Sequence, residues 1–173
     1  MNKAEIVITR RRNEFLVKVR GRATFEYSPP LRNLVKGFSP SDQIDKFCVD
    51  LSECNAMDST FMGVLTMLSL AARRYKAPVE IANASEHNRG LLVGLGIEKM
   101  FTFVEVSAQQ PDPASKTSVQ TQPPTTQPDM RERTETVLDA HKVLMDVDDA
   151  NKDKFKVVVD LAKKDLDRQQ EKK

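Results

Sequence analysis

An abrupt change of composition between Val106 and Met130 divides the chain into two parts. This stretch contains five prolines, is rich in glutamine and threonine, and has almost no apolar residue. Such a segment cannot bury enough apolar surface to offset the conformational entropy lost on folding. The composition therefore predicts a disordered linker at residues 107–130, between a folded domain at 1–106 and a C-terminal tail at 131–173.

Strand and helix patterns alternate along the first part of the chain. Two β-branched runs, residues 5–9 and 15–19, predict a hairpin. Further strand-like runs lie at 44–51, 79–82 and 100–104, separated by apolar residues at helical spacing over 28–37, 61–75 and 85–96. Right-handed crossovers would make the later strands parallel. The order predicts an α/β domain with a mixed sheet of four or five strands and helices packed on it.

The strand at 44–51 is expected at the centre of the sheet. Phe47, Val49 and Leu51 fall on one of its faces, and Ile44 and Cys48 fall on the other. Apolar residues on both faces are typical of a strand covered on both sides.

The tail shows two amphipathic helical patterns separated by polar residues at 148–151. One stripe comprises Val137, Leu138, His141, Leu144 and Met145, and the other comprises Phe155, Val158, Val159, Ala162 and Leu166. The pattern predicts a helical hairpin. Two such helices bury little surface alone, so we expect them to dock on the α/β domain, on a second copy of the chain, or on a partner.

The near balance of charge argues against a direct nucleic-acid partner. The chain has 27 basic and 25 acidic side chains, a formal net charge of +2, so no overall field attracts DNA or an anionic membrane. Arg10–Arg12 lack interleaved aromatic residues and are interpreted as a solvated turn. The N-terminus lacks a signal-peptide core, and no segment has the roughly 20 apolar residues that span a bilayer. We expect a cytoplasmic protein.

No motif for catalysis, a metal or a cofactor stands out. Cys48 is interpreted as a core residue and Cys54 as a turn residue, without the spacing of a metal site or a disulfide framework. His87 and His141 lie outside any catalytic pattern and are assigned structural roles. Ser59 lacks a Gly-x-Ser-x-Gly context, and the chain has no glycine-rich phosphate loop. We expect a protein that is not an enzyme and holds no cofactor.

The junction at Asp58-Ser59-Thr60 has two interpretations. These residues follow a strand and open a helix, where an aspartate or hydroxyl oxygen caps the free backbone amides. A serine there can also be phosphorylated, because a helix N-terminus tolerates the added negative charge. The same charge could prevent a partner from binding.

Several residues of this region resemble a known signature. Asp50-Leu51 ends the strand, Met57–Gly63 reads MDSTFMG, and a Gly-Leu-Gly-Ile run stands at Gly94–Ile97. Together they resemble the STAS domain of anti-sigma factor antagonists over roughly residues 4–106, excluding the linker and the tail. The resemblance implies a STAS-like fold.

The resemblance also implies a role in partner switching. Ser59, or alternatively Thr60, would be phosphorylated by an anti-sigma factor that is a serine kinase, with Asp58 positioning the hydroxyl. The unphosphorylated antagonist would bind this kinase, phosphorylation would release it, and a phosphatase would reset it. The implied partner surface comprises Asp58, Ser59, Thr60, Phe61 and Met62, with Ser52, Glu53 and Asn55 from an adjacent strand-end turn.

Two features of the chain depart from the family pattern. Phe61 replaces a glycine, and it either anchors a partner or belongs to the core. The tail has no counterpart in the resemblance and could fold back over the Ser59 surface as an inhibitor. An alternative function is therefore a non-catalytic interaction module, or scaffold, whose helical tail is the main partner-binding element.

Overall fold

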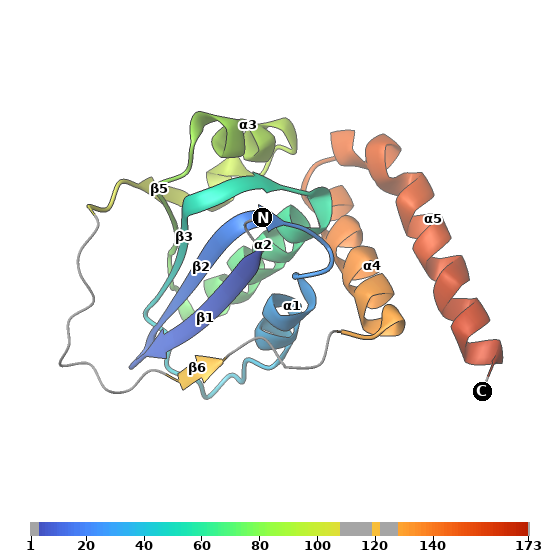
Figure 1. Cartoon of the computed structure of the whole chain (residues 1–173), viewed down its shortest axis with the longest axis horizontal. Coiled ribbons are helices and arrows are strands. Elements are labelled where there is room, and N and C mark those ends of the chain that lie inside the picture. Colours follow the sequence, from blue (N-terminus) through green and yellow to red (C-terminus); the bar gives the residue numbers. More distant parts are fainter. Residues whose placement is uncertain (1–3, 108–118, 122–127, 173) are drawn as a thin grey trace.

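The N-terminal hairpin establishes the alternation of the sheet. The computed structural model describes residues 4–107, 119–121 and 128–172. Strands β1 (Glu5–Arg11) and β2 (Glu14–Ala23) pair antiparallel, with Ile6 opposite Val19 (Figure 1). Alternate side chains of both strands are buried, as a half-covered sheet requires. The tight connection between the strands places Arg12 at φ 54°, in the left-handed region.

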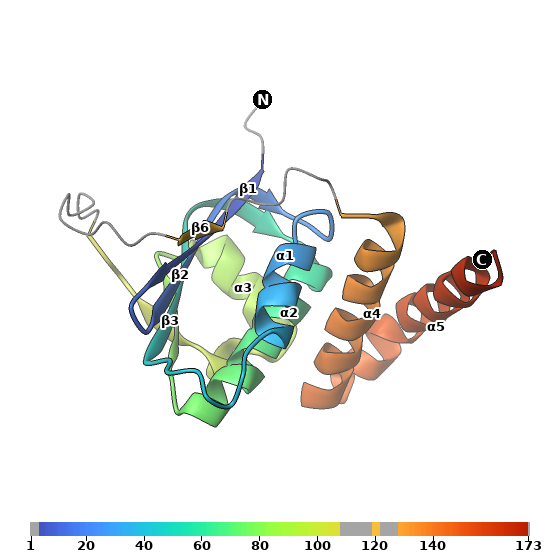
Figure 2. The same ribbon diagram turned by 90° about the horizontal axis from the view of Figure 1, so that it is seen from below.

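Three parallel strands extend this hairpin in the predicted order. They are β3 (Lys46–Met57), β4 (Val79–Ala82) and β5 (Thr102–Val104). The crossovers contain α1 (Pro29–Lys36), α2 (Ser59–Ala72) with η1 (Arg73–Tyr75), and α3 (Glu86–Gly94) with η2 (Glu98–Met100). Figure 2 shows these helices on one side of the sheet. The predicted mixed α/β fold is confirmed.

Strand β3 corrects two expectations. Phe47, Val49 and Leu51 are buried under the helices, whereas Cys48 on the other face is only half-buried, so the prediction of a strand covered on both sides was wrong. The strand also continues through Ser52–Asn55 to Met57, because its pairing with β2 persists to Ala23 through two register shifts. Ser52–Asn55 therefore form no turn, and Cys54 is a buried strand residue.

The tail forms the predicted helical hairpin, and it docks on the α/β domain of the same chain. Its helices are α4 (Met130–Val147) and α5 (Ala150–Glu171). Both views show α4 between the α/β domain and α5 (Figures 1 and 2). Ala140 and Leu144 of α4 are fully buried and belong to the main hydrophobic core. A smaller apolar cluster around Leu138, Val159 and Ala162 joins the two helices.

A short segment of the predicted linker adds a strand to the sheet. β6 (Val119–Thr121) pairs antiparallel with β1, giving the order β5-β4-β3-β2-β1-β6. The sequence did not predict this strand. Most of the predicted linker lies outside the described residues, so the domain boundaries remain predictions. Within the described part of the chain, no helix is both long and apolar enough to cross a membrane.

Two leucines of the hairpin test how firmly α4 is docked. Leu144 has no exposed surface and Leu161 of α5 is 56% exposed. Replacing Leu144→Ala should lower the free energy of unfolding by about 2–5 kcal/mol, because it leaves a cavity in the core. Leu161→Ala should change it by about 0.5 kcal/mol or less. Urea unfolding followed by circular dichroism measures both, and equal effects would contradict the docked arrangement.

Candidate partner-binding site at the start of α2

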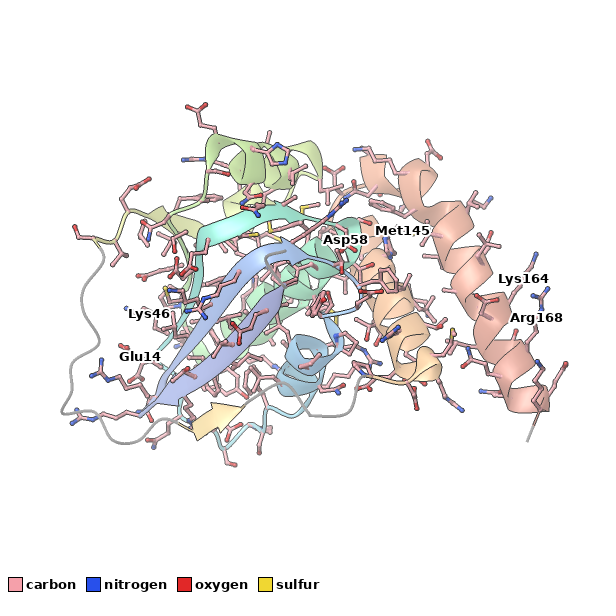
Figure 3. All side chains as sticks on the ribbon, in the orientation of Figure 1. Glu14, Lys46, Asp58, Met145, Lys164 and Arg168 are labelled. Atoms are coloured by element: carbon pink, nitrogen blue, oxygen red, sulfur yellow. The ribbon has the colours of Figure 1, made fainter. Side chains whose placement is uncertain are left out.

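Asp58 holds the start of α2 in place. It is the N-cap residue in an extended conformation, and its Oδ1 accepts a hydrogen bond of 2.9 Å from the Phe61 amide. Its Oδ2 accepts a second bond of 2.7 Å from the amide of Phe25, in the loop before α1. Its own amide donates to the Ala23 carbonyl. Asp58 thus performs the capping role and also joins α2 to the end of β2. Figure 3 shows it on the side of the domain that faces the hairpin.

Ser59, the first residue of α2, makes its side-chain contact with the tail. Its Oγ lies 2.8 Å from His141 Nε2 on α4, and the residue is half-buried. His141 Nδ1 lies 2.6 Å from the Val137 carbonyl. A carbonyl can only accept, so Nδ1 carries the proton of the neutral ring and Nε2 is the acceptor. The Ser59 hydroxyl therefore donates to His141.

The surroundings of His141 keep its ring neutral. The residue is 3% exposed, and the Phe155 ring of α5 packs edge-on against it with centroids 4.8 Å apart. Burial lowers the pKa of His141 below its ordinary value, although the hydrogen bond to Val137 and the charge of Asp58 act in the opposite direction. The structural role assigned to His141 from the sequence includes a direct contact with the candidate phosphorylation site.

The next three residues of α2 are buried. Thr60 is 4%, Phe61 0% and Met62 5% exposed. Of the two roles left open for Phe61, the structure places it in the core. These three side chains are out of a partner's reach in this structure, and Ser59 and Asp58 are the half-buried residues of the junction.

The residues expected from the strand-end turn lie elsewhere. Ser52, Glu53 and Asn55 are exposed on β3. Glu53 pairs with Lys18 at 2.8 Å and with Arg20 at 3.3 Å on the uncovered face of the sheet. Ser59 instead faces α4 on the helical side, so the structure does not bring Glu53 and Ser59 together in one surface.

Gly63 allows the two helices to approach closely. A Cβ atom on Gly63 would lie 2.5 Å from the Ala140 carbonyl oxygen and 2.6 Å from the Ala140 Cβ. Any larger residue at this position would have to push α4 away. Ala140 has no exposed surface and faces Gly63, so a small residue stands on each side of the contact. A glycine inside a helix is unfavourable by about 1 kcal/mol and suggests a close approach, but no local pattern of the sequence identifies Ala140 as its neighbour.

An ion-pair cluster holds α4 against α1. Buried Arg32 places Nε and Nη2 each 2.8 Å from Asp139 Oδ2, and Lys36 Nζ lies 2.7 Å from the same oxygen. Burial acts to raise the pKa of Asp139, but the hydrogen bonds and charges of Lys36 and Arg32 outweigh it and hold that pKa below its ordinary value. Sequence patterns cannot pair side chains 107 positions apart.

The turn after α4 and the first residues of α5 supply a third attachment. Asn151 is buried and donates from Nδ2 to the Leu95 carbonyl at 3.0 Å, and Lys154 Nζ donates to the Gly94 carbonyl at 3.0 Å. Gly96, at φ 69°, leaves room for Asp148. The hairpin therefore contacts α2, α1 and the loop after α3. Among the described residues, no group of three or more His, Cys, Asp or Glu side chains could hold a metal ion.

A double-mutant cycle tests the contact between Ser59 and His141. Ser59→Ala leaves the buried Nε2 acceptor without its donor, so the free energy of unfolding should fall by about 1–3 kcal/mol. In the background of His141→Ala the same substitution should cost much less, giving a clear interaction energy. Urea unfolding measures all four proteins. Additive effects would show that the hydroxyl does not bind the ring.

The lowered pKa of His141 also predicts a pH dependence. Between about pH 7.5 and 5.5 the unfolded chain binds a proton at this ring more readily than the folded chain, so stability falls as the pH falls. His141→Gln should flatten this part of the profile. His87→Gln, at an exposed position on α3, is the matched control and should keep the slope. Urea unfolding at three pH values compares the slopes, and equal slopes in both variants would contradict the assignment.

Comparison with known proteins identifies the family of the chain. The fold is similar to that of the anti-sigma factor antagonist SpoIIAA in its unphosphorylated form, with a TM-score of 0.45, 10% sequence identity, and coverage of 63% of this chain and 90% of that one. It is also similar to that of a Thermotoga maritima protein, with a TM-score of 0.48, 13% identity, and coverage of 62% of this chain and 88% of that one. No curated protein matches the chain. The family model described as "Mlab, STAS domain" matches residues 6–105, more than half of the chain, and the protein therefore belongs to the STAS domain family.

Proposed function

We propose that this STAS protein is a non-catalytic antagonist in a partner-switching pathway. Its unphosphorylated domain binds an anti-sigma factor kinase through the start of α2, and phosphorylation of Ser59 releases it. The observation that carries the proposal is the position of the Ser59 hydroxyl. It lies at the first residue of α2, is half-buried, and donates its proton to a group that lies beyond the α/β domain.

Phosphorylation would change residue 59 from a neutral hydrogen-bond donor into a negatively charged acceptor. The free hydroxyl donates one hydrogen bond, whereas a phosphoserine carries about 1.5 to 2 negative charges and only acceptor oxygens. The helix N-terminus stabilises the new charge, so the domain itself tolerates it. A partner that accepts the Ser59 proton would lose that bond and meet an anion, and a buried mismatch of this kind costs several kcal/mol.

The contact between Ser59 and His141 superficially resembles a nucleophile beside a general base. The side of the hydroxyl that faces His141 is occupied by α4, and the ring is itself covered by Phe155. We interpret the bond as a docking contact. A cytoplasmic location, a reset by a phosphatase, and the absence of direct nucleic-acid binding are parts of the same proposal.

One observation favours a second function, in which the tail is the main partner-binding element. Val157 and Leu161, one turn apart on α5, are 67% and 56% exposed. Lys164 and Arg168 lie on the outer side of the same helix (Figure 3). An interaction module of this kind would bind its partner through α5. Replacing Val157→Ser and Leu161→Ser together would abolish this binding, whereas a substitution at Ser59 would leave it unchanged.

The proposal is tested with the anti-sigma factor kinases of the organism that encodes this chain. Each purified kinase is incubated with the protein and ATP, and modified residues are mapped by mass spectrometry. We expect phosphate on Ser59 and its loss in Ser59→Ala, whereas Ser52→Ala, at an exposed serine on β3, should be modified like the unaltered protein. Calorimetry should then show that Ser59→Ala binds the kinase and Ser59→Asp binds it at least tenfold more weakly. Equal binding of these two variants would contradict the proposed regulation by phosphorylation.

A further inference from the structure

The hairpin covers the part of α2 that the proposed function assigns to a partner. His141 accepts the Ser59 proton, Ala140 lies against Gly63, and Leu144 is buried in the same core. Thr60, Phe61 and Met62 are buried in this state. The docked hairpin therefore fills the space that a partner at Ser59 would need.

Much of the hairpin's attachment is polar. It consists of the hydrogen bond at Ser59, the ion pairs of Asp139 with Arg32 and Lys36, and the hydrogen bonds to the carbonyls of Gly94 and Leu95. The apolar part centres on Ala140 and Leu144, with Phe155 packed beside them. Since the hairpin is connected covalently to the domain, a modest interface keeps it docked through its high effective concentration. Few residues separate Thr121 of β6 from the start of α4 at Met130, which keeps the hairpin near its docking surface.

We propose that the start of α2 is a helix-binding surface that α4 occupies within the same chain, and that partner and hairpin exclude one another. This inference rests on the proposed function for the identity of the site. The partner then presents a helix, with a small residue facing Gly63 and a hydrogen-bond acceptor facing Ser59. The hairpin is a competitor built into the chain, and it must leave before the partner or a kinase reaches Ser59.

Gly63 supplies the reason for a helix with a small residue. A Cβ at this position would meet the backbone carbonyl and the Cβ of Ala140, so the backbone of whatever lies there comes within direct contact of α2. Residues 140 and 141 follow each other on α4, and they reach Gly63 and Ser59, which are one turn apart on α2. A helix crossing α2 at this point satisfies both contacts at once.

The test uses the full chain and a labelled peptide of its own residues 129–172. In the unaltered protein the surface is occupied, and the peptide should bind weakly. Ala140→Leu in the full chain enlarges the residue that faces Gly63 and should expel the hairpin. The labelled peptide, which keeps its alanine, should then bind at least tenfold more tightly, as measured by fluorescence anisotropy.

Two controls keep the result specific. Lys142→Leu makes the same substitution at an exposed position of α4 and should bind the peptide as weakly as the unaltered protein. Adding Gly63→Val to the Ala140→Leu protein removes the space for a close helix and should abolish the gain. Hydrogen exchange should show faster exchange over α4 in Ala140→Leu, with the amides of β3 still protected.

Three outcomes would overturn the inference. Absence of a gain in peptide binding by Ala140→Leu would refute the exchangeable surface, and an equal gain in Lys142→Leu would show that the binding is non-specific. Joint loss of protection in α4 and β3 would make the hairpin an inseparable part of the fold. None of these measurements involves a kinase or phosphate, so the proposed function can fail in its own test while the helix-binding surface stands, and the reverse.

Discussion

The absence of a side chain at Gly63 is the constraint on which the position of the tail depends. Because α2 carries no Cβ there, α4 comes into backbone contact with it at Ala140. This approach brings His141 within hydrogen-bonding distance of Ser59 and lets Leu144 enter the core. The ion pairs at Arg32 and the contacts of the turn then fix the ends of the hairpin. A residue as small as alanine at position 63 would compete with all of these contacts.

Asp58 and Ser59 are adjacent but have different roles. Both carboxylate oxygens of Asp58 are used by backbone amides, so its contribution is to hold the start of α2 against the loop before α1. Ser59 makes no such backbone contact among those described, and its hydroxyl is directed to α4. The capping and the regulatory interpretations of this junction are therefore compatible, because they concern different side chains.

The sequence predicted the elements that carry their own periodicity and missed the contacts between distant ones. The strand at Val79–Ala82 has the predicted bounds, and both tail helices were recognised from their apolar stripes. The end of β3 was misassigned because Ser52–Asn55 are polar and resemble a turn, whereas pairing with β2 keeps them extended. The bond between Ser59 and His141 spans 82 positions, and no local pattern contains it. The sequence thus located the junction but could not show that the tail covers it.

A competitor within the same chain changes how the affinity of such a protein is set. If the surface of α2 is open in only a fraction of molecules, the apparent dissociation constant rises by the inverse of that fraction, about 100-fold for an open population of about 1%. Phosphate on Ser59 acts on both occupants, because a phosphoserine has no hydroxyl proton to give to His141 or to a partner. The proposed modification would therefore remove the present hydrogen bond from Ser59 to the hairpin as well as the one that a partner would accept. The strength of the contacts at Gly63, Ser59 and Arg32 would then set the concentration that a partner needs in order to bind. The tail would in this way lower the affinity for the partner without contacting it.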